Sequence, residues 1–330
     1  MIRLDTSAQD LERAAEMLRG GKLVAFPTET VYGLGADAAS PEAVAGIFRA
    51  KGRPADHPVI VHLPSAKDLQ HWADHVPASA HRLAAMFWPG PLTLVLRRAA
   101  GVSDAITGDQ DTVGLRVPGN RAALALLRVF GGALAAPSAN RFGHVSPTTA
   151  DHVMAEFSGD EVAAVVDGGA CAVGVESTIV DLSGTRPRLL RPGMIRVDAI
   201  EAEIGAGLER VDDQQGPRAS GRLESHYAPG AAVELVDPAA LTERLEACAL
   251  ADERIAVLAR REASTTAASV TWIEMPRQPV QFARALYASL RQADFEKPDR
   301  ILVEVPPDSP GWDAIADRLS KAAAPRPNAG

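Results

Sequence analysis

The chain has 330 residues, of which 46% are hydrophobic and 23% are charged, and its formal net charge is -8 at pH 7. This length predicts two domains, and the composition is that of an ordinary globular protein. The acidic balance argues against a broad nucleic-acid interface, which would need a basic surface. A few local cations and backbone N–H groups would still be enough to bind a nucleotide.

Two cysteines, Cys171 and Cys248, lie far apart in the sequence and form no zinc or disulfide pattern. Such usage is typical of reduced thiols in the cytoplasm. The N-terminal residues contain acids and no apolar segment, so they do not resemble a signal peptide. No run approaches the ~18 apolar residues needed to span a bilayer. We therefore expect a cytoplasmic protein without membrane contact.

Helix-like and strand-like patterns alternate along the chain, which indicates an α/β fold. The first helix has an apolar face from Leu11 to Leu18, and Pro27 ends the buried strand that follows it. Ser40 and Pro41 open the next helix, because serine caps a helix and proline suits its first position. Further helices are expected near residues 81–87, 122–129, 150–157 and 199–204. Strands are expected near residues 23–26, 59–63, 92–96, 113–117, 133–136, 162–166 and 178–182.

The sheet of this part should be twisted and mixed, because several strands follow one another without an intervening helix. Residues 205–230 are polar and follow neither the helical nor the strand period, which indicates a linker. A smaller, Rossmann-like α/β domain follows, with strands near 233–236, 255–259, 270–273 and 301–305 and helices near 239–249, 282–290 and 312–322. The predicted division is a first domain at 1–204, a linker at 205–230 and a second domain at 231–330.

The densest group of polar residues runs from Pro27 to Gly35, where hydroxyls, an acid, a phenol and two glycines follow a buried strand. Glycine allows close approach of a ligand, although the same residue types also form ordinary turns. Lys51 and Arg53 then stand at a helix end. They either complement the helix dipole there or hold a polyphosphate.

Arg116 lies in an otherwise apolar strand, where a charge is unfavourable unless it is paired. A carboxylate substrate would be a suitable partner. Ser138 and Asn140 end a strand of small residues, and Ser146 opens another helix and could be only its cap. The chain has no Walker loop, Gly-x-Gly-x-x-Gly turn, nucleophile elbow or zinc motif.

Taken in order, these segments resemble the YrdC-like threonylcarbamoyl-AMP synthases, in their long form with a linker and a C-terminal domain. The shared segments are Pro27–Gly35, Lys51–Pro54, His57–His62, Trp88–Thr93, Thr112–Pro118, Pro137–Asn140, Ser146–Thr148, Gly174–Val180 and Arg191–Gly193. The second half resembles the long form mainly through residues 225–229, Ser-His-Tyr-Ala-Pro. Residues 141–144 depart from the Ser-Gly that often follows Ser-Ala-Asn in the family.

The resemblance implies that L-threonine, bicarbonate and ATP give threonylcarbamoyl-AMP, pyrophosphate and water, with Mg²⁺ carried by ATP. A carbamate formed from threonine would attack the α-phosphorus, so no side-chain nucleophile is needed. The product would pass to the tRNA threonylcarbamoyl transferase complex. The linker is expected to act as a lid over the site, because carbamates are labile in water.

The resemblance also implies roles for individual residues. Lys51 and Arg53 would be the catalytic cations. The expected threonine-binding residues are Thr30, His62, Arg116, Ser177 and the backbone near Ala136. The expected ATP-binding residues are Arg53, His57, Thr112, Ser138, Asn140, Ser146, Arg191 and, on the linker, Tyr227. No protein ligand for a metal is expected.

Two other functions are compatible with parts of the pattern. Carbamoyl-transfer enzymes of the hydrogenase-maturation type contain a related domain, but they are much longer and carry zinc-finger and acylphosphatase segments that this sequence lacks. An RNA-binding module is the second alternative, since relatives have been linked to double-stranded RNA. The acidic net charge argues against RNA binding as the main role and leaves room only for a weak contact.

Overall fold

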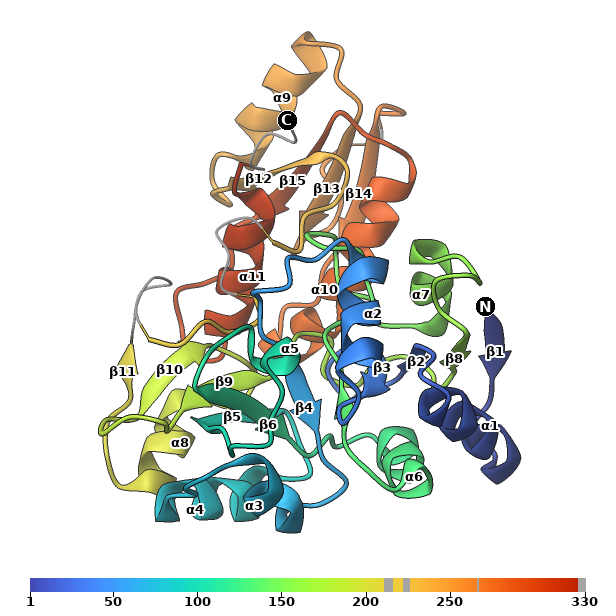
Figure 1. Cartoon of the computed structure of the whole chain (residues 1–330). Helices are drawn as coiled ribbons and strands as arrows, with labels where there is room; N and C mark the ends of the chain where they lie inside the picture. Colours follow the sequence, from blue (N-terminus) through green and yellow to red (C-terminus); the bar gives the residue numbers. More distant parts are fainter. Residues whose placement is uncertain (211–215, 222–225, 266, 326–330) are drawn as a thin grey trace. The chain divides into compact units, whose positions relative to one another are not determined.

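A computed structural model describes residues 1–210, 216–221, 226–265 and 267–325 (Figure 1). The chain divides into two compact units, and the main boundary at residue 222 falls inside the range expected for the linker. The first unit comprises residues 1–142 and 146–222, and the second comprises 143–145 and 223–330. Over the described ranges, none of the helices combines the length and the apolar character that crossing a bilayer requires.

The first unit contains a mixed sheet whose described strands follow the order β1-β8-β2-β3-β7-β4-β6-β5-β9-β10-β11. β4 is parallel to β6, whereas β5 is antiparallel to β6, so the expected mixed sheet is confirmed. The strands are β1 (Ile2–Leu4), β2 (Val24–Phe26), β3 (Gly33–Asp37), β4 (Ile60–His62), β5 (Leu92–Arg97), β6 (Thr112–Arg116), β7 (Leu134–Ala135), β8 (Ala164–Val166), β9 (Thr178–Asp181), β10 (Arg188–Arg191) and β11 (Glu209–Arg210).

The helices of the first unit begin where the sequence offers caps. Ser7 accepts a hydrogen bond from Asp10 N before the first helix, and Ser40 does the same for Ala43 N before the second. Gly52 ends the second helix with a φ of 62°, a conformation that favours glycine. The helices are α1 (Ala8–Arg19), α2 (Pro41–Lys51), α3 (Leu69–Trp72), α4 (Ala78–Phe87), α5 (Asp104–Thr107), α6 (Arg121–Phe130), α7 (Ala150–Glu156) and α8 (Val197–Ile204).

Helices cover both faces of the first sheet, because successive residues of its strands point to opposite sides. Val24 and Phe26 of β2 pack in a cluster with α1 and α6, which lie side by side (Figure 1). Ala25, between them, belongs to the larger cluster formed with α2, α4 and α8. The strand ends that carry the polar motifs are thereby held by cores on both faces.

The second unit is a parallel sheet of four described strands in the order β12-β15-β13-β14. This arrangement confirms the expected second α/β region. Its strands are β12 (Ala232–Val236), β13 (Ile255–Ala259), β14 (Val270–Glu274) and β15 (Arg300–Glu304), and its helices are α9 (Leu241–Leu250), α10 (Pro279–Phe295) and α11 (Asp313–Ala323). All five residues of β13 are buried, as is usual for a parallel strand covered on both faces.

Candidate active site

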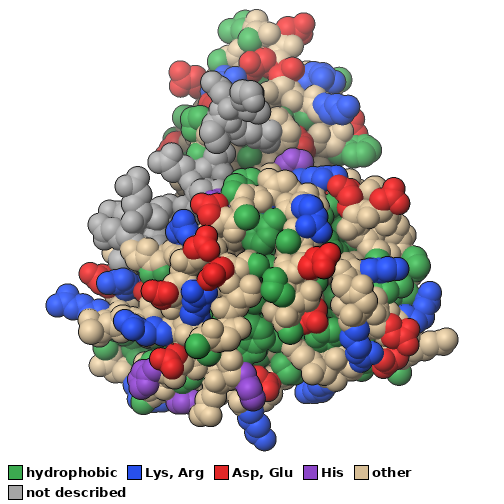
Figure 2. All heavy atoms as spheres, viewed as in Figure 1, with side chains coloured by type: hydrophobic (Ala, Val, Ile, Leu, Met, Phe, Trp, Pro, Cys, Tyr) green, Lys and Arg blue, Asp and Glu red, His purple; other side chains and the backbone are tan. Residues whose placement is uncertain are grey.

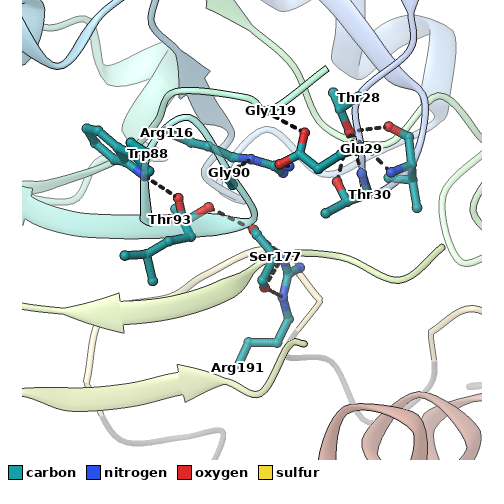
Figure 3. A network of polar contacts seen from close by, with 12 residues as sticks. Thr28, Glu29, Thr30, Trp88, Gly90, Thr93, Arg116, Gly119, Ser177 and Arg191 are labelled. Carbon is teal, nitrogen blue, oxygen red and sulfur yellow. Dashed lines mark hydrogen bonds and ion pairs between the residues drawn. The ribbon is translucent and has the colours of Figure 1, made fainter. Parts of the chain in front are cut away.

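The turn between β2 and β3 is built by a threonine pair (Figure 3). Thr28 Oγ1 donates to Val31 O at 2.6 Å, and it lies 2.8 Å from Thr30 Oγ1. A hydroxyl has only one proton, and that of Thr28 is used on Val31. Thr30 must therefore donate to Thr28, and the lone pairs of the Thr30 hydroxyl remain able to accept a hydrogen bond from a ligand.

Arg116 and His62 lie opposite each other on the neighbouring parallel strands β6 and β4. Arg116 is 3% exposed, and its buried charge has a protein partner, because Nη2 lies 2.5 Å from Glu29 Oε1. Its Nε donates to Gly90 O at 3.3 Å. Glu29 also accepts Gly119 N–H at 2.8 Å through its second oxygen. Sequence reasoning required a partner for Arg116 but did not single out Glu29.

His62 is 3% exposed, and its ring meets Phe26 edge to face with 5.9 Å between ring centroids. Burial, and then the charge of Arg116, lower the pKa of His62 to about 3. In the described part of the chain, no group hydrogen-bonds to its Nδ1. The imidazole is therefore neutral at physiological pH and can take part in recognition without adding charge.

The depressed pKa of His62 predicts a pH-dependent stability of the first unit. Between its ordinary pKa of 6.5 and its folded-state pKa of about 3, the unfolded chain binds more protons, so stability falls as pH falls. The loss is about 1.4 kcal/mol per pH unit in this window. Urea unfolding at pH ~7.5 and ~5.0 should show a loss roughly 2 kcal/mol larger in the wild type than in His62→Gln. Equal losses in the two proteins would contradict this assignment.

Ser177, which was predicted to bind threonine, contacts Arg191, which was predicted to bind ATP (Figure 3). Its hydroxyl lies 2.8 Å from Thr93 Oγ1 of β5. Arg191, at the end of β10, donates from Nε and Nη2 to Ser177 O, both at 3.1 Å. Gly193 is required beside this pair, because a Cβ there would lie 2.3 Å from Thr178 N. An expected threonine contact and an expected ATP contact thus touch each other.

Lys51 is the last residue of α2, and its side chain is 3% exposed. Its Nζ donates to Ser138 O at 2.6 Å and also to Asn140 O. Phe142 N donates in return to Lys51 O at 2.9 Å. Burial, and then the charge of Arg53, hold the pKa of Lys51 well below its usual value. The predicted cation therefore fastens the strand end that carries the predicted serine and asparagine.

Arg53 is 8% exposed and donates from Nη2 to Pro58 O at 3.0 Å and to Ser220 Oγ at 3.4 Å. Ser220 O in turn accepts Arg191 Nη1 at 2.7 Å. One linker residue thus contacts both arginines that were predicted to bind ATP. His57 lies nearby, and burial, followed by the charge of Arg53, lowers its pKa.

A small pocket of about 20 Å³ adjoins Ser220 on the same face of the sheet. Its walls include Ile60, Thr112 and Gly114 from β4 and β6. Thr112 was predicted to contact ATP, and the pocket places it beside the linker residues 218–220. Ala136, predicted to contact threonine, donates its N–H to Ile60 O at 2.9 Å and so follows directly on β7.

Ser146 is fully buried, and its hydroxyl donates to Glu176 Oε1 at 2.6 Å. The alternative that it caps a helix is wrong, because α7 begins at Ala150 and Thr149 accepts from His152 N. Glu176, 7% exposed, was not among the predicted site residues. Its position beside Ser177 in the sequence was the available signal.

Tyr227 lies in the second unit and is 1% exposed. Its ring stacks on Tyr287 with 5.6 Å between ring centroids, and Arg318 lies 5.4 Å above it. The other predicted site residues belong to the first unit. Ser225 and the linker positions 211–215 and 222–224 fall outside the described residues.

Comparisons with known proteins agree with this architecture. One family model, described as "Telomere recombination", matches residues 16–193, and another, described as "Threonylcarbamoyl-AMP synthase, C-terminal domain", matches residues 195–324. The threonylcarbamoyl-AMP synthase of Bacillus subtilis is 39% identical, covering 98% of this chain and 95% of the relative. That of Pyrococcus abyssi is 47% identical, over 68% of this chain and 67% of the relative.

A crystal structure of Pyrococcus abyssi Sua5 complexed with L-threonine is 38% identical, with a TM-score of 0.90, and the match covers 98% of this chain and 97% of that one. The mixed sheet, its buried network of cations and hydroxyls and the parallel second unit define a long-form YrdC-like protein. More specifically, the chain belongs to the threonylcarbamoyl-AMP synthase family.

Proposed function

We propose that this chain converts L-threonine, bicarbonate and ATP into threonylcarbamoyl-AMP, pyrophosphate and water. Family membership supports this activity. The observation that carries it is the direct contact of Ser177 with Arg191, at 3.1 Å, in one buried network. That contact joins one residue proposed for threonine to one proposed for ATP, which supports a shared site, as a reaction between the two substrates requires.

The proposed threonine subsite is formed by Thr30, His62, Arg116, Ser177 and the backbone at Ala136. Arg116 would bind the carboxylate, because a guanidinium matches a carboxylate in shape and charge. The Thr30 hydroxyl would accept a hydrogen bond from the amino acid, since its own proton is directed to Thr28. Neutral His62 adds no charge beside Arg116, so it would not alter the charge balance of the carboxylate contact.

The proposed ATP subsite centres on Arg53 and Arg191, whose guanidinium groups both contact Ser220. Arginine recognises phosphate through paired N–H donors. Mg²⁺ would enter bound to the phosphates, as part of the substrate. Further proposed contacts are His57, Thr112, Ser138, Asn140 and Ser146. Lys51 would support this subsite as a catalytic cation, next to Arg53.

The chemistry would need no side-chain nucleophile. The threonine amine and bicarbonate would combine to a carbamate and water, and a carbamate oxygen would form a bond to the α-phosphorus. The bond from the α-phosphorus to the bridging oxygen would break, and pyrophosphate would leave with its electron pair. The protein would contribute alignment and charge neutralisation, which dominate phosphoryl-type transfers.

We further propose that the linker acts as a lid, through the described segment 216–221. Arg218 N donates to Gln110 Oε1 at 2.6 Å, and Gln110 Nε2 donates back to Arg218 O at 3.1 Å. The Arg218 guanidinium also lies 3.5 Å from Asp56. These contacts hold the segment beside the small pocket and next to Arg53. A closed segment would exclude water from the labile carbamate.

The lid proposal predicts that Arg218→Ala speeds the release of ATP. The variant loses an exposed ion pair with Asp56, which contributes little by itself, and a charge-assisted hydrogen bond to Gly108 O, which contributes more. We expect the dissociation rate to rise about 10-fold, the equivalent of ~1.4 kcal/mol. Stopped-flow release of a fluorescent ATP analogue measures it, with Arg128→Ala, exposed on α6, as control. An unchanged rate would argue that this segment is no lid.

The product would pass to the tRNA threonylcarbamoyl transferase complex, and we propose that this takes place in the cytoplasm. On the face seen in Figure 2, basic and acidic side chains are interspersed. Together with the net charge of -8, this favours transfer through the complex, with at most a weak contact between this chain and RNA.

The activity is tested by mixing the protein with L-threonine, labelled bicarbonate and Mg-ATP. We expect a labelled adenylate and an equal amount of pyrophosphate, and neither product when threonine, bicarbonate or Mg²⁺ is omitted. Pyrophosphate release that does not depend on threonine would contradict the proposal.

A further inference from the structure

Glu29 occupies a position between two parts of the first unit that are distant in sequence. It follows β2, and its side chain is 11% exposed. One oxygen contacts Arg116 Nη2 at 2.5 Å, and the other accepts Gly119 N–H at 2.8 Å. The single carboxylate of Glu29 therefore holds both the guanidinium of Arg116 on β6 and the loop that follows β6 (Figure 3).

Two of the three guanidinium nitrogens of Arg116 donate hydrogen bonds to other parts of the protein. Nε is used on Gly90 O at 3.3 Å, and Nη2 is used on Glu29. In the part of the chain that the structure describes, Nη1 makes no hydrogen bond. A guanidinium held at two of its three nitrogens cannot turn about its long axis without breaking a contact. The third nitrogen is then fixed in one direction and remains available to a ligand.

The charges around Arg116 are compatible with a zwitterionic amino acid as the ligand. A buried arginine without a counter-ion is strongly unfavourable, so Glu29 stabilises the buried charge of Arg116. The Arg116–Glu29 pair is neutral overall, and a zwitterionic amino acid is neutral too. Removing the Glu29 charge would attract the ligand's carboxylate and repel its adjacent ammonium group. These two effects largely cancel, so the orientation of the guanidinium should decide affinity.

We propose that Glu29 is a positioning residue that holds Arg116 with Nη1 available to the carboxylate of the amino-acid substrate. This inference rests on the proposed function, since it takes threonine as the ligand of Arg116. Glu29 itself need not touch the substrate. It acts through the guanidinium, and its second contact, to Gly119, keeps the carboxylate from following Arg116 if the arginine moves.

The proposal is tested with Glu29→Gln. The amide keeps the size of the side chain, but it offers an acceptor to only one of the two donors, Arg116 or Gly119. We expect the KM for threonine to rise about 10- to 100-fold, the loss of one charge-assisted hydrogen bond, while the KM for ATP stays within about twofold. Glu209→Gln is the matched control, because Glu209 forms an exposed pair with Arg188 at 3.4 Å. It should change neither KM.

A substrate lacking the carboxylate separates positioning from a general loss of structure. L-threoninol cannot use Arg116 as a carboxylate partner, so Glu29→Gln should hardly change its dissociation constant. The preference of the protein for threonine over threoninol should therefore fall at least 10-fold in the variant. Equal weakening of both ligands, or a parallel rise of both KM values, would overturn the proposal.

A second variant and the activity of the wild type distinguish the possible causes of a negative result. If Glu29→Gln does not fold, Glu29→Asp retains the charge with a shorter reach, and a selective rise in the KM for threonine should appear there in weaker form. An unchanged KM in a folded Glu29→Asp would then count against the inference. Failure of the wild type to form any adenylate would refute the proposed function, whereas an active wild type with an unaffected Glu29→Gln would refute only the role of Glu29.

Discussion

Replacing Arg53 with alanine should strongly slow adenylate formation while the first unit remains folded. The guanidinium stands at the end of α2, close to Ser220 and Arg191, where the phosphates of ATP are proposed to bind. Its contacts include hydrogen bonds of 3.0 Å to Pro58 O and 3.4 Å to Ser220 Oγ, and its guanidinium lies 5.8 Å from the centre of the Phe142 ring. Removing a preorganised donor that faces developing charge lowers the rate by about 10²- to 10³-fold, whereas the loss of stability should stay near ~1 kcal/mol.

Pyrophosphate release at saturating threonine and bicarbonate measures this effect, and thermal unfolding checks the fold. Arg49→Ala is the matched control, since Arg49 is exposed on α2, four residues before Arg53 in the sequence. That variant should keep normal activity. Normal pyrophosphate release by Arg53→Ala would remove Arg53 from the mechanism.

Replacing Arg116 with glutamine should strongly weaken the binding of threonine and leave ATP binding intact. The variant loses the proposed carboxylate contact and strands Glu29, which is 11% exposed, without its cation. Loss of the charge-assisted hydrogen bond from Nη1 to the carboxylate corresponds to roughly 3 kcal/mol, which is about a 100-fold rise in the KM for threonine.

The stranded Glu29 should also destabilise the first unit by a few kcal/mol. Kinetics are therefore measured well below the melting temperature of the variant, and Arg116→Lys, which keeps the charge, is compared with it. The KM for ATP is the internal standard, because the side-chain hydrogen bonds of Arg116 go to Gly90 O and Glu29, neither of which is proposed to bind the nucleotide. A parallel rise in both KM values would show that the substitution had damaged the whole site.

Much of the fold follows from local sequence patterns. The buried strand before Pro27, the capped helix after Ser40 and the alternation of the second unit were all predictable. Elements such as α3 (Leu69–Trp72), α5 (Asp104–Thr107) and β1 (Ile2–Leu4) were not. They span three or four residues, too few for either period to be recognised. The strand expected at 133–136 shortens to Leu134–Ala135 just before Pro137, which has no N–H for a ladder bond.

The sequence indicated site residues whose type is unusual for their position in the chain. The residues that contact them in the fold were missed. Arg116 stood out as a charge in an apolar strand, but nothing in the sequence shows that its partner comes from the loop after β2, 87 residues away. Thr93 and Ser220 were missed for the same reason, because each is recognised only by its contact with a residue that is distant in the sequence. Glu176 was not selected as a site residue, although its neighbour in the sequence, Ser177, was.

The central claim is that one buried network in the first unit holds the two substrates next to each other and aligned for reaction. A crystal structure of the protein with L-threonine and a non-hydrolysable ATP analogue tests it most directly. We expect the threonine carboxylate within hydrogen-bond distance of Arg116, the phosphates at Arg53 and Arg191, and the amine of threonine facing the α-phosphate. Ligands bound in separate places, or phosphates that leave both arginines untouched, would contradict the account.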